Sequence, residues 1–252
     1  MKKLFLSLTF SLLAVMNIYA DSEVIAHRGY WKANGSTQNS RASLQKALDL
    51  NIFGSEIDIW LTADGKLVVN HDTEYQGVKI QSAKYKDCKN LILKNGERMP
   101  QLKDLLKMMK ETKSRTKLII EIKSHETLEA NQEAAREAVE AVKKYGVANQ
   151  VEYISFNFDT CKELVKVDPN AQVAYLNGDK TPTELHQIGI TGIDYHIKVI
   201  RQHPEWIQEA QGLGMKVNVW TVNKKEDIQE MSKAGVDYIT TDEPELAVQL
   251  TK

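Results

Sequence analysis

Short apolar runs alternate with longer amphipathic stretches along most of the chain. An apolar run bounded by turn residues is typical of a buried strand, whereas apolar positions three and four residues apart are typical of a helix packed on one face. Eight strands are predicted, at Val24–Ala26, Gly54–Leu61, Leu118–Ile122, Val151–Ser155, Gln172–Tyr175, Gly192–Tyr195, Lys216–Thr221 and Asp237–Thr240. Helices are predicted between and after them, at Arg41–Leu50, Leu102–Glu111, Leu128–Tyr145, Thr160–Val167, Pro182–Gln187, Pro204–Leu213, Lys225–Ala234 and Glu243–Leu250.

The regular alternation of strand and helix indicates a parallel sheet with crossover helices. Eight such units fit a single closed (β/α)8 TIM-type barrel better than a doubly wound open sheet, which is the alternative. Residues 73–100 follow another short apolar run, Leu67–Asn70, and have little helical period. We therefore expect a small insertion after the second barrel strand, on the face where the strands end and where barrel enzymes place their chemistry.

Carboxylates occupy alternate positions on two of the predicted strands. Side chains alternate across a strand, so Glu56 and Asp58 share one face of Gly54–Leu61. Glu121 and Lys123 likewise share one face of the next barrel strand. The isoleucines between them suit the helix-packed outside of the barrel, so we expect the three carboxylates to converge inside it.

Buried carboxylates need a partner of opposite charge. Oxygen ligands alone favour one hard divalent cation, Mg²⁺ or Ca²⁺, at Glu56, Asp58 and Glu121. The alternative is an ion-pair cluster with Lys123 and Arg28. We favour the metal, because an isolated ion cluster rarely offsets the cost of removing its charges from water.

Two histidines fall at the predicted catalytic end of the barrel. His27 ends the first strand and His71 follows the second, which makes them candidates for acid–base catalysis. Arg28 offers the paired donors that suit a phosphate group. Trp220 faces the barrel mouth, where it could form an apolar wall for a substrate or simply fill the core.

The first twenty residues read as a secretory signal peptide. Two lysines precede a short apolar run, and Ala20 ends the segment on a small residue. We therefore expect residues 21–252 to form the barrel of an exported protein, periplasmic or secreted, without a stable membrane anchor after cleavage. In an exported protein Cys88 and Cys161 could pair or remain buried thiols, and the sequence does not decide between these.

Composition narrows the choice of partners. Hydrophobic residues make up 42% of the chain and the formal net charge is −1, so there is no basic field for nucleic acid. We therefore expect a small-molecule substrate and no nucleic-acid partner. The oligomeric state is left open.

The ordered set of motifs resembles that of the glycerophosphodiester phosphodiesterases over nearly the whole mature chain. No single motif carries the resemblance. The matching segments, in order, are Ala26-His27-Arg28-Gly29, Glu56-Ile57-Asp58, Thr62-Ala63-Asp64-Gly65, Leu67-Val68-Val69-Asn70-His71-Asp72, Glu121-Ile122-Lys123, Trp220-Thr221-Val222-Asn223 and Gly235-Val236-Asp237-Tyr238-Ile239-Thr240-Thr241-Asp242.

The resemblance implies the role of each candidate residue. Glu56, Asp58 and Glu121 would ligate the divalent metal, and His27 and His71 would be the general acid and base. Arg28, Lys123 and Trp220 would bind substrate, the first two at its phosphate. The implied reaction cleaves a glycerophosphodiester to glycerol 3-phosphate and an alcohol, by attack of water or of the neighbouring glycerol hydroxyl.

One position departs from the family pattern. Members of the family usually have Pro-Glu-Asn-Thr after the first strand, and this chain has Thr37-Gln38-Asn39-Ser40. Gln38 can form hydrogen bonds but carries no charge. We expect Gln38, Asn39 and Asp72 to support the residues that bind metal and substrate, and we expect activity to survive the change with altered metal affinity or substrate range.

Two other functions fit the same barrel. A phospholipase C-like or sphingomyelinase D-like enzyme would act on intact lipid, and it should present apolar or basic elements around the site for membrane contact. A non-catalytic binding protein would show decay of the catalytic set, but Gln38 is the only candidate for such decay.

Overall fold

The computed structural model describes residues 21–251 of the 252-residue chain. The predicted signal peptide, residues 1–20, lies outside the described residues. No helix within residues 21–251 is both long and apolar enough to cross a membrane.

Eight parallel strands close into a barrel, because β1 pairs with β11 on one side and with β2 on the other. The closure confirms the predicted TIM-type barrel and excludes the doubly wound sheet. The barrel strands, in sequence order, are β1 (Glu23–Ala26), β2 (Gly54–Leu61), β6 (Lys117–Ile122), β7 (Val151–Ser155), β8 (Val173–Tyr175), β9 (Gly192–His196), β10 (Lys216–Trp220) and β11 (Tyr238–Thr241).

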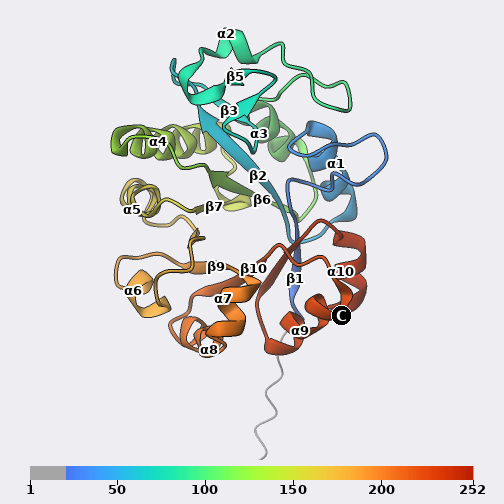
Figure 1. Ribbon diagram of the computed structural model, residues 1–252, viewed down its shortest axis with the longest axis vertical. Helices are drawn as coiled ribbons and strands as arrows, with labels where there is room; N and C mark the ends of the chain where they lie inside the picture. Colours follow the sequence, from blue (N-terminus) through green and yellow to red (C-terminus); the bar gives the residue numbers. More distant parts are fainter. Residues whose placement is uncertain (1–20, 252) are drawn as a thin grey trace, which may run out of the picture.

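Helices surround the strands on the outside (Figure 1). The main helices are α1 (Arg41–Leu50), α3 (Leu102–Glu111), α4 (Leu128–Tyr145), α5 (Phe158–Val167), α6 (Pro182–His186), α8 (Glu205–Gly212), α9 (Lys225–Ala234) and α10 (Pro244–Leu250). Two short 3-10 turns, η1 (Ile80–Ser82) and η2 (Ala148–Gln150), complete the connections.

Four predicted helices have boundaries that differ from the structure by one or two residues. The largest difference is at α5, which begins at Phe158 rather than Thr160, because the Asn157 side chain accepts a hydrogen bond from the Thr160 N–H and caps the helix there. A short extra helix, α7 (Ile197–Gln202), precedes α8. The His196 side chain accepts a hydrogen bond from the Lys198 N–H at its start, a cap that the preference for Ser, Thr, Asp and Asn does not predict.

Strand alternation divides the apolar residues into two cores. Ile57 and Ile59 point outward from β2 into the main core between barrel and helices. A smaller cluster fills the inside of the barrel and consists of Ile25, Ile119, Ile154 and Leu176. Ile119 is in register with Glu56, and Ile154 with Glu121, so these apolar side chains border the carboxylates inside the barrel.

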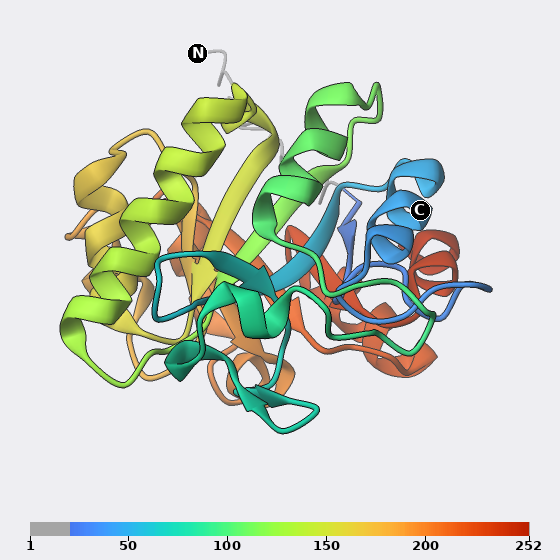
Figure 2. The ribbon, with the colours of Figure 1, turned by 90° about the horizontal axis from the view of Figure 1, so that it is seen from above.

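The predicted insertion is present as a lobe after β2. A hairpin returns the chain as β3 (Leu67–Val69), antiparallel to β2. The lobe contains the two-stranded sheet of β4 (Glu74–Tyr75) and β5 (Val78–Lys79), and the short helix α2 (Tyr85–Cys88). It stands out beyond the ring of helices in both views (Figures 1 and 2). Its own small core is formed by Trp60, Val68, Ile80, Cys88, Leu93 and Met99.

The two cysteines are unpaired and buried in different cores. Cys88 belongs to the small core of the insertion, and Cys161 to the main core. Burial raises the pKa of the Cys161 thiol to about 12, so this thiol is protonated and inert at neutral pH.

Candidate active site

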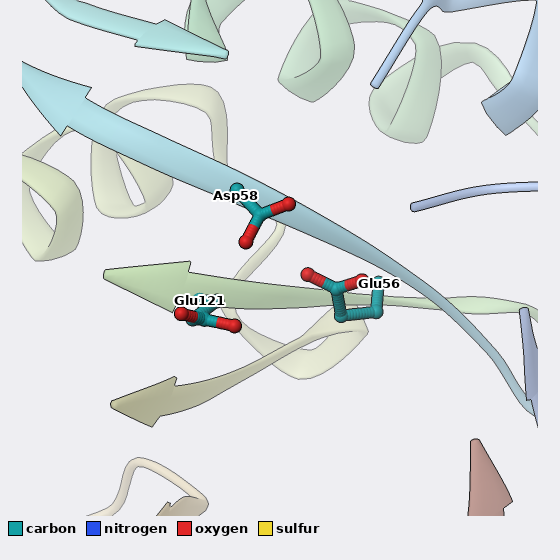
Figure 3. A group of neighbouring side chains, drawn as sticks. All are labelled: Glu56, Asp58 and Glu121. Atoms are coloured by element: carbon teal, nitrogen blue, oxygen red, sulfur yellow. The ribbon is translucent and has the colours of Figure 1, made fainter. Parts of the chain in front are cut away.

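The three predicted carboxylates meet inside the barrel at the junction of β2 and β6. These strands are direct neighbours, and Asp58 is paired in register with Glu121. One oxygen from each of Glu56, Asp58 and Glu121 lies within 4.8 Å of the others, and all three side chains are buried. Figure 3 shows them projecting from the two strands toward a common space.

The loop after β1 holds two of these carboxylates in place. Asn39 Nδ2 donates to Asp58 Oδ2 at 2.8 Å, and the Asp58 N–H donates to Asn39 Oδ1 at 3.0 Å. The Arg28 N–H donates to Glu56 Oε2 at 2.7 Å. Arg28 and Asn39 both have positive φ, 56° and 57°. Their backbones are therefore in the left-handed region, an uncommon conformation that costs energy and often accompanies functional sites.

Gly29 is required for this loop to pack. Its φ is 75°, and a Cβ at this position would lie 2.3 Å from Ser43 Oγ on α1. The loop thus approaches α1 more closely than any residue with a side chain permits. This close approach fixes the backbone of Arg28, which in turn orients Glu56.

The carboxylate cluster fits a divalent cation better than an ion-pair cluster. Lys123 Nζ lies 3.2 Å from Asp58 Oδ1 and 2.7 Å from Glu121 Oε1. However, Glu56 Oε1 is buried and has no hydrogen-bond partner within residues 21–251. Arg28 Nε also lies 3.8 Å from Asp58 Oδ2, but neither side chain supplies a partner for Glu56 Oε1. A divalent cation would supply the missing partner.

The pKa values of Glu56 and Glu121 also favour a bound cation. Burial and repulsion from Asp58 raise the pKa of Glu56 well above its usual range. The same two causes raise the pKa of Glu121 to about 7, despite the attraction of Lys123. Glu56 and Glu121 therefore hold protons near neutral pH, whereas at Asp58 the effect of burial is outweighed by the charge of Lys123, which lowers the pKa. A bound cation would displace these protons.

His27 is held by a network that closes around Asp242. His27 Nδ1 lies 2.8 Å from Asp242 Oδ1, which also accepts a hydrogen bond from Trp31 Nε1 at 2.9 Å. Asn223 Nδ2 donates to Asp242 Oδ2 at 2.8 Å. Burial would raise the pKa of Asp242, but the hydrogen bonds from His27 and Trp31 outweigh it and hold the pKa below its usual range. Asp242 is therefore ionised and fixes the His27 ring, leaving Nε2 available.

His71 is held by its neighbour in the sequence. His71 Nδ1 lies 2.8 Å from Asp72 Oδ1. Partial burial lowers the pKa of His71, although the nearby Asp58 raises it. The imidazole is therefore neutral at neutral pH and able to accept a proton.

Both histidines line one cavity with Glu56 and Glu121. The cavity has a volume of about 130 Å³ and also contacts Arg28. Its opposite side is apolar and is formed by Phe156, Leu176 and Trp220. Trp220 donates from Nε1 to the Asp194 carbonyl at 2.9 Å, and its ring meets Phe156 edge-on at 5.4 Å. Trp220 therefore forms a wall of this cavity.

The sequence profile of the Glycerophosphoryl diester phosphodiesterase family matches residues 27–246. The chain belongs to this family. Its members share the barrel seen here, and the matched region begins at His27 and includes every residue of the cavity.

Individual relatives of the family agree with this assignment. A crystal structure of a glycerophosphodiester phosphodiesterase from Parabacteroides distasonis is 48% identical and superposes with a TM-score of 0.90, covering 92% of this chain and 98% of that one. A glycerophosphodiester phosphodiesterase from Caldanaerobacter subterraneus is 29% identical over 91% of this chain and 97% of its own length. A phosphodiesterase from Oleispira antarctica, solved with its product sn-glycerol-3-phosphate, shares the fold at 22% identity, a TM-score of 0.79, and coverage of 91% and 97%.

The three supporting residues predicted from the sequence all contact the site. Asn39 bonds to Asp58, Asp72 bonds to His71, and Gln38 Oε1 accepts a hydrogen bond from an Arg28 guanidinium nitrogen at 2.9 Å. In this member of the phosphodiesterase family, the uncharged Gln38 therefore touches the residue expected to bind phosphate rather than the carboxylates.

Several residues in or around the cavity of this phosphodiesterase escaped the sequence analysis. Asp242 was quoted as part of a motif but given no role, although its place after the last strand is where barrel enzymes put such residues. Phe156 has no place in the sequence analysis, and it lines the cavity. Asp194 is also buried in the cavity wall, and burial raises its pKa to about 8. The signal available in the sequence was that Asp194 is the one acidic residue in the apolar predicted strand Gly192–Tyr195.

Proposed function

We propose that the chain catalyses metal-dependent hydrolysis of glycerophosphodiesters to glycerol 3-phosphate and an alcohol, in the breakdown of phospholipid-derived diesters. One observation carries the proposal: a cluster of three buried carboxylates opens through Glu56 and Glu121 onto a cavity of about 130 Å³ that two carboxylate-bound histidines also line. Membership of the family supports the reaction class. The product complex of the Oleispira antarctica phosphodiesterase suggests glycerol 3-phosphate as the product to assay.

Glu56, Asp58 and Glu121 are the residues that would hold the cation. Oxygen ligands alone favour Mg²⁺ or Ca²⁺. When bound, the cation would supply Lewis-acid polarisation of a phosphoryl oxygen and orientation of the glycerol hydroxyls. Asn39 keeps Asp58 oriented toward this position through two hydrogen bonds.

Arg28 and Lys123 would bind the phosphate. Arg28 lines the cavity, and its Nε is buried and without a hydrogen-bond partner within residues 21–251. Lys123 Nζ lies nearby, against Asp58 and Glu121. Burial would lower the pKa of Lys123, but Asp58 and Glu121 raise it above its usual value, so the ammonium stays charged. Two fixed cations in a partly buried site stabilise the negative charge that develops on a phosphoryl group.

His27 and His71 would exchange the protons of the reaction. One imidazole takes a proton from the attacking oxygen, and the other gives a proton to the leaving alcohol oxygen. Asp242 and Asp72 each hold an Nδ1, so Nε2 is the reacting nitrogen of both rings. The apolar wall of Phe156, Leu176 and Trp220 would contact the carbon atoms of the substrate and exclude water.

We also propose that the protein is exported and acts in the periplasm or after secretion. The proposal rests on the sequence of residues 1–20 alone. Fractionation of cells that express the full chain, with N-terminal sequencing of the mature protein, tests it. A cytoplasmic protein that keeps its first residue would contradict it.

The deciding experiment follows release of glycerol 3-phosphate from glycerophosphocholine, glycerophosphoethanolamine and glycerophosphoinositol by residues 21–252. Each diester is tested with Mg²⁺, with Ca²⁺ and with a chelator. We expect release that the chelator abolishes and that one of the two cations restores. Glu56→Gln should lose cation binding in calorimetry together with activity.

Three outcomes would contradict the proposal. Release of glycerol 3-phosphate that persists in the presence of a chelator would show that the reaction does not need a bound metal. Faster cleavage of intact lysolipid than of soluble diesters would favour the lipid-directed alternative. A membrane-binding surface would need several exposed apolar side chains, and Ile92 is the one large exposed aliphatic side chain in residues 73–100. Tight binding without turnover would favour a binding protein.

A further inference from the structure

A second groove, with a volume of about 280 Å³, adjoins the catalytic cavity, and His71 lines both. It lies outside the barrel mouth, between the loop after β1 and the lobe after β2. The side chains that face each other across it are Trp31, Thr37 and Gln38 from the loop, and Asp72, Tyr75 and Lys94 from the lobe.

The two walls of the groove are fastened to each other. Glu97, on the lobe, accepts hydrogen bonds from the N–H groups of Arg41 and Ala42 at the start of α1, both at 3.1 Å. Asn95 Nδ2 donates to the carbonyl of Gly35 in the loop at 3.4 Å. In Figure 2 the blue loop after β1 and the green end of the lobe run side by side. The groove is therefore a fixed feature of the fold, braced at its outer end.

The catalytic cavity is too small for a whole diester. Cavities that enclose a small-molecule ligand usually measure about 300 Å³ or more, and the catalytic cavity measures about 130 Å³. Together the cavity and the groove reach that range. Since His71 stands between them and is one of the two rings proposed to exchange protons with the reacting oxygens, an alcohol attached to the phosphorus on this side extends into the groove.

The charges of the groove favour a neutral occupant. Asp72 and Lys94 are the two charged side chains that line it besides His71, and their charges are opposite. A cation in the groove would be repelled by the Lys94 ammonium, and an anion by the Asp72 carboxylate. A neutral group with hydroxyls can donate to the carboxylate and accept from the ammonium at the same time.

The uncharged side chains of the groove suit hydroxyl groups on a carbon ring. Gln38 Oε1 accepts from Arg28, so the NH₂ end of the Gln38 amide is left as a donor. Thr37 adds a hydroxyl, which can donate or accept. The half-buried rings of Trp31 and Tyr75 supply apolar surface between these polar groups.

We propose that this groove binds the leaving alcohol of the diester and selects a neutral, hydroxyl-rich head group such as inositol over a trimethylammonium head group such as choline. The inference rests on the proposed function and extends it from the phosphate to the alcohol side of the substrate. Choline offers no donor or acceptor at its charged end, so it leaves the polar groups of the groove unpaired. A site built to hydrogen-bond its ligand rejects such an analogue.

The test compares KM values, because the head groups also differ in intrinsic reactivity, which enters kcat. KM for glycerophosphoinositol should be about tenfold below KM for glycerophosphocholine, the effect of one or two additional hydrogen bonds. The cyclohexyl diester of glycerol 3-phosphate has a similar ring without the other hydroxyls, and its KM should also exceed that of the inositol diester.

Two variants on opposite walls test the groove itself. Lys94→Ala should raise KM for glycerophosphoinositol by about three- to tenfold with kcat unchanged, because it removes binding and not chemistry. It should not raise KM for glycerophosphocholine, since it also removes a repulsion. Thr37→Val keeps the shape of the side chain and removes the hydroxyl, and it should raise KM for the inositol diester alone by about threefold.

Lys89→Ala is the matched control. Lys89 directly follows α2 on the same lobe and is exposed like Lys94, but it does not line the groove. Its removal changes the net charge of the lobe by the same amount. KM for both diesters should therefore stay unchanged.

Three results would overturn the proposal. Equal KM values of the wild-type protein for the inositol, choline and cyclohexyl diesters would do so even if both groove variants failed to fold. Equal changes for the inositol and choline diesters in Lys94→Ala and Thr37→Val would assign these side chains to the structure of the loop and the lobe. The same change in Lys89→Ala as in Lys94→Ala would replace the contact in the groove by a general effect of charge.

Failure of this inference can be told apart from failure of the proposed function. If glycerol 3-phosphate is released from all three diesters with equal KM, the proposed function stands and the groove does not select. If no diester is cleaved, the proposed function fails, and calorimetry then compares binding of the same diesters to the cation-loaded protein. Tighter binding of glycerophosphoinositol that Lys94→Ala weakens would support the groove without any turnover, and equal binding would contradict it.

Discussion

The two histidines of the site make the same contact in very different surroundings. Each places Nδ1 at 2.8 Å from a carboxylate oxygen. The carboxylate of Asp242 is 16% exposed and has further hydrogen bonds from Trp31 and Asn223. The carboxylate of Asp72 is 74% exposed. Equal distances therefore describe a fixed network at His27 and a solvated contact at His71.

The difference teaches that a distance alone does not measure a contact. Water competes for an exposed carboxylate and screens its charge, so such pairs contribute little. A carboxylate that is partly buried and accepts several hydrogen bonds keeps its partner in one orientation. His27 should therefore depend strongly on Asp242, whereas His71 should depend on its own burial more than on Asp72.

Removal of either imidazole should have the largest effect. His27→Ala and His71→Ala should each lower kcat by about 10²- to 10⁴-fold, because each removes one partner in proton transfer. Cation binding and the thermal unfolding midpoint should change little. The measurement is kcat on glycerophosphocholine with calorimetry of cation binding. Near-normal turnover by either variant would show that the two rings do not share the chemistry.

Exchange of the supporting carboxylates should separate the two histidines. We expect Asp242→Asn to lower kcat by about 10²-fold, because the amide no longer fixes the His27 ring with the correct nitrogen free. Asp72→Asn is the matched variant, and it should cost only a few-fold because its carboxylate is solvated. Equal losses of kcat in the two variants would contradict this expectation, and would show that burial does not decide how much each carboxylate–histidine contact contributes to catalysis.

The same pair shows what could be predicted from the sequence. Asp72 is adjacent to His71, so its support was predicted. Asp242 lies 215 residues from His27, and only the closing of the barrel between β1 and β11 brings them together. Strand alternation placed Glu56, Asp58 and Glu121 on the inner face, since that needs only a period of two and neighbouring strands.

Contacts across the barrel were beyond the sequence analysis for the same reason. Which side chains face one another over the cavity depends on strand order, register and the depth at which each strand ends. Phe156 follows β7 and Asp194 lies on β9, far in sequence from Glu56 and Asp58. Their place in the cavity wall depends on the closed sheet, whereas the fold itself followed from the repeated strand–helix pattern.

The titration of His71 gives a third test of its surroundings. Burial lowers its pKa, while Asp58 and the hydrogen bond to Asp72 raise it. Asp72→Asn should therefore move the titration of His71 to lower pH. A bound cation beside Asp58 should do the same, because a nearby positive charge disfavours the imidazolium. In both cases the neutral, proton-accepting form extends to lower pH. Histidine NMR signals followed with and without Mg²⁺ measure this, and a shift to higher pH would contradict it.

The smallest expected effect on kinetics comes from changing Gln38, whose uncharged side chain is a hydrogen-bond acceptor. Gln38 accepts a hydrogen bond from Arg28, the residue next to His27. Gln38→Glu keeps the geometry and adds a charge, so it strengthens the hold on Arg28 and competes with the phosphate for the guanidinium. We expect KM for glycerophosphocholine to rise by only a few-fold, with kcat nearly unchanged, because the hydrogen bond already orients Arg28.

Gln38→Ala is the control, and it should lower kcat/KM by freeing Arg28. An unchanged KM and cation affinity in Gln38→Glu would mean that this departure from the family pattern has no consequence for binding. A large loss of kcat would mean that charge, more than burial, decides what a supporting contact contributes at this site.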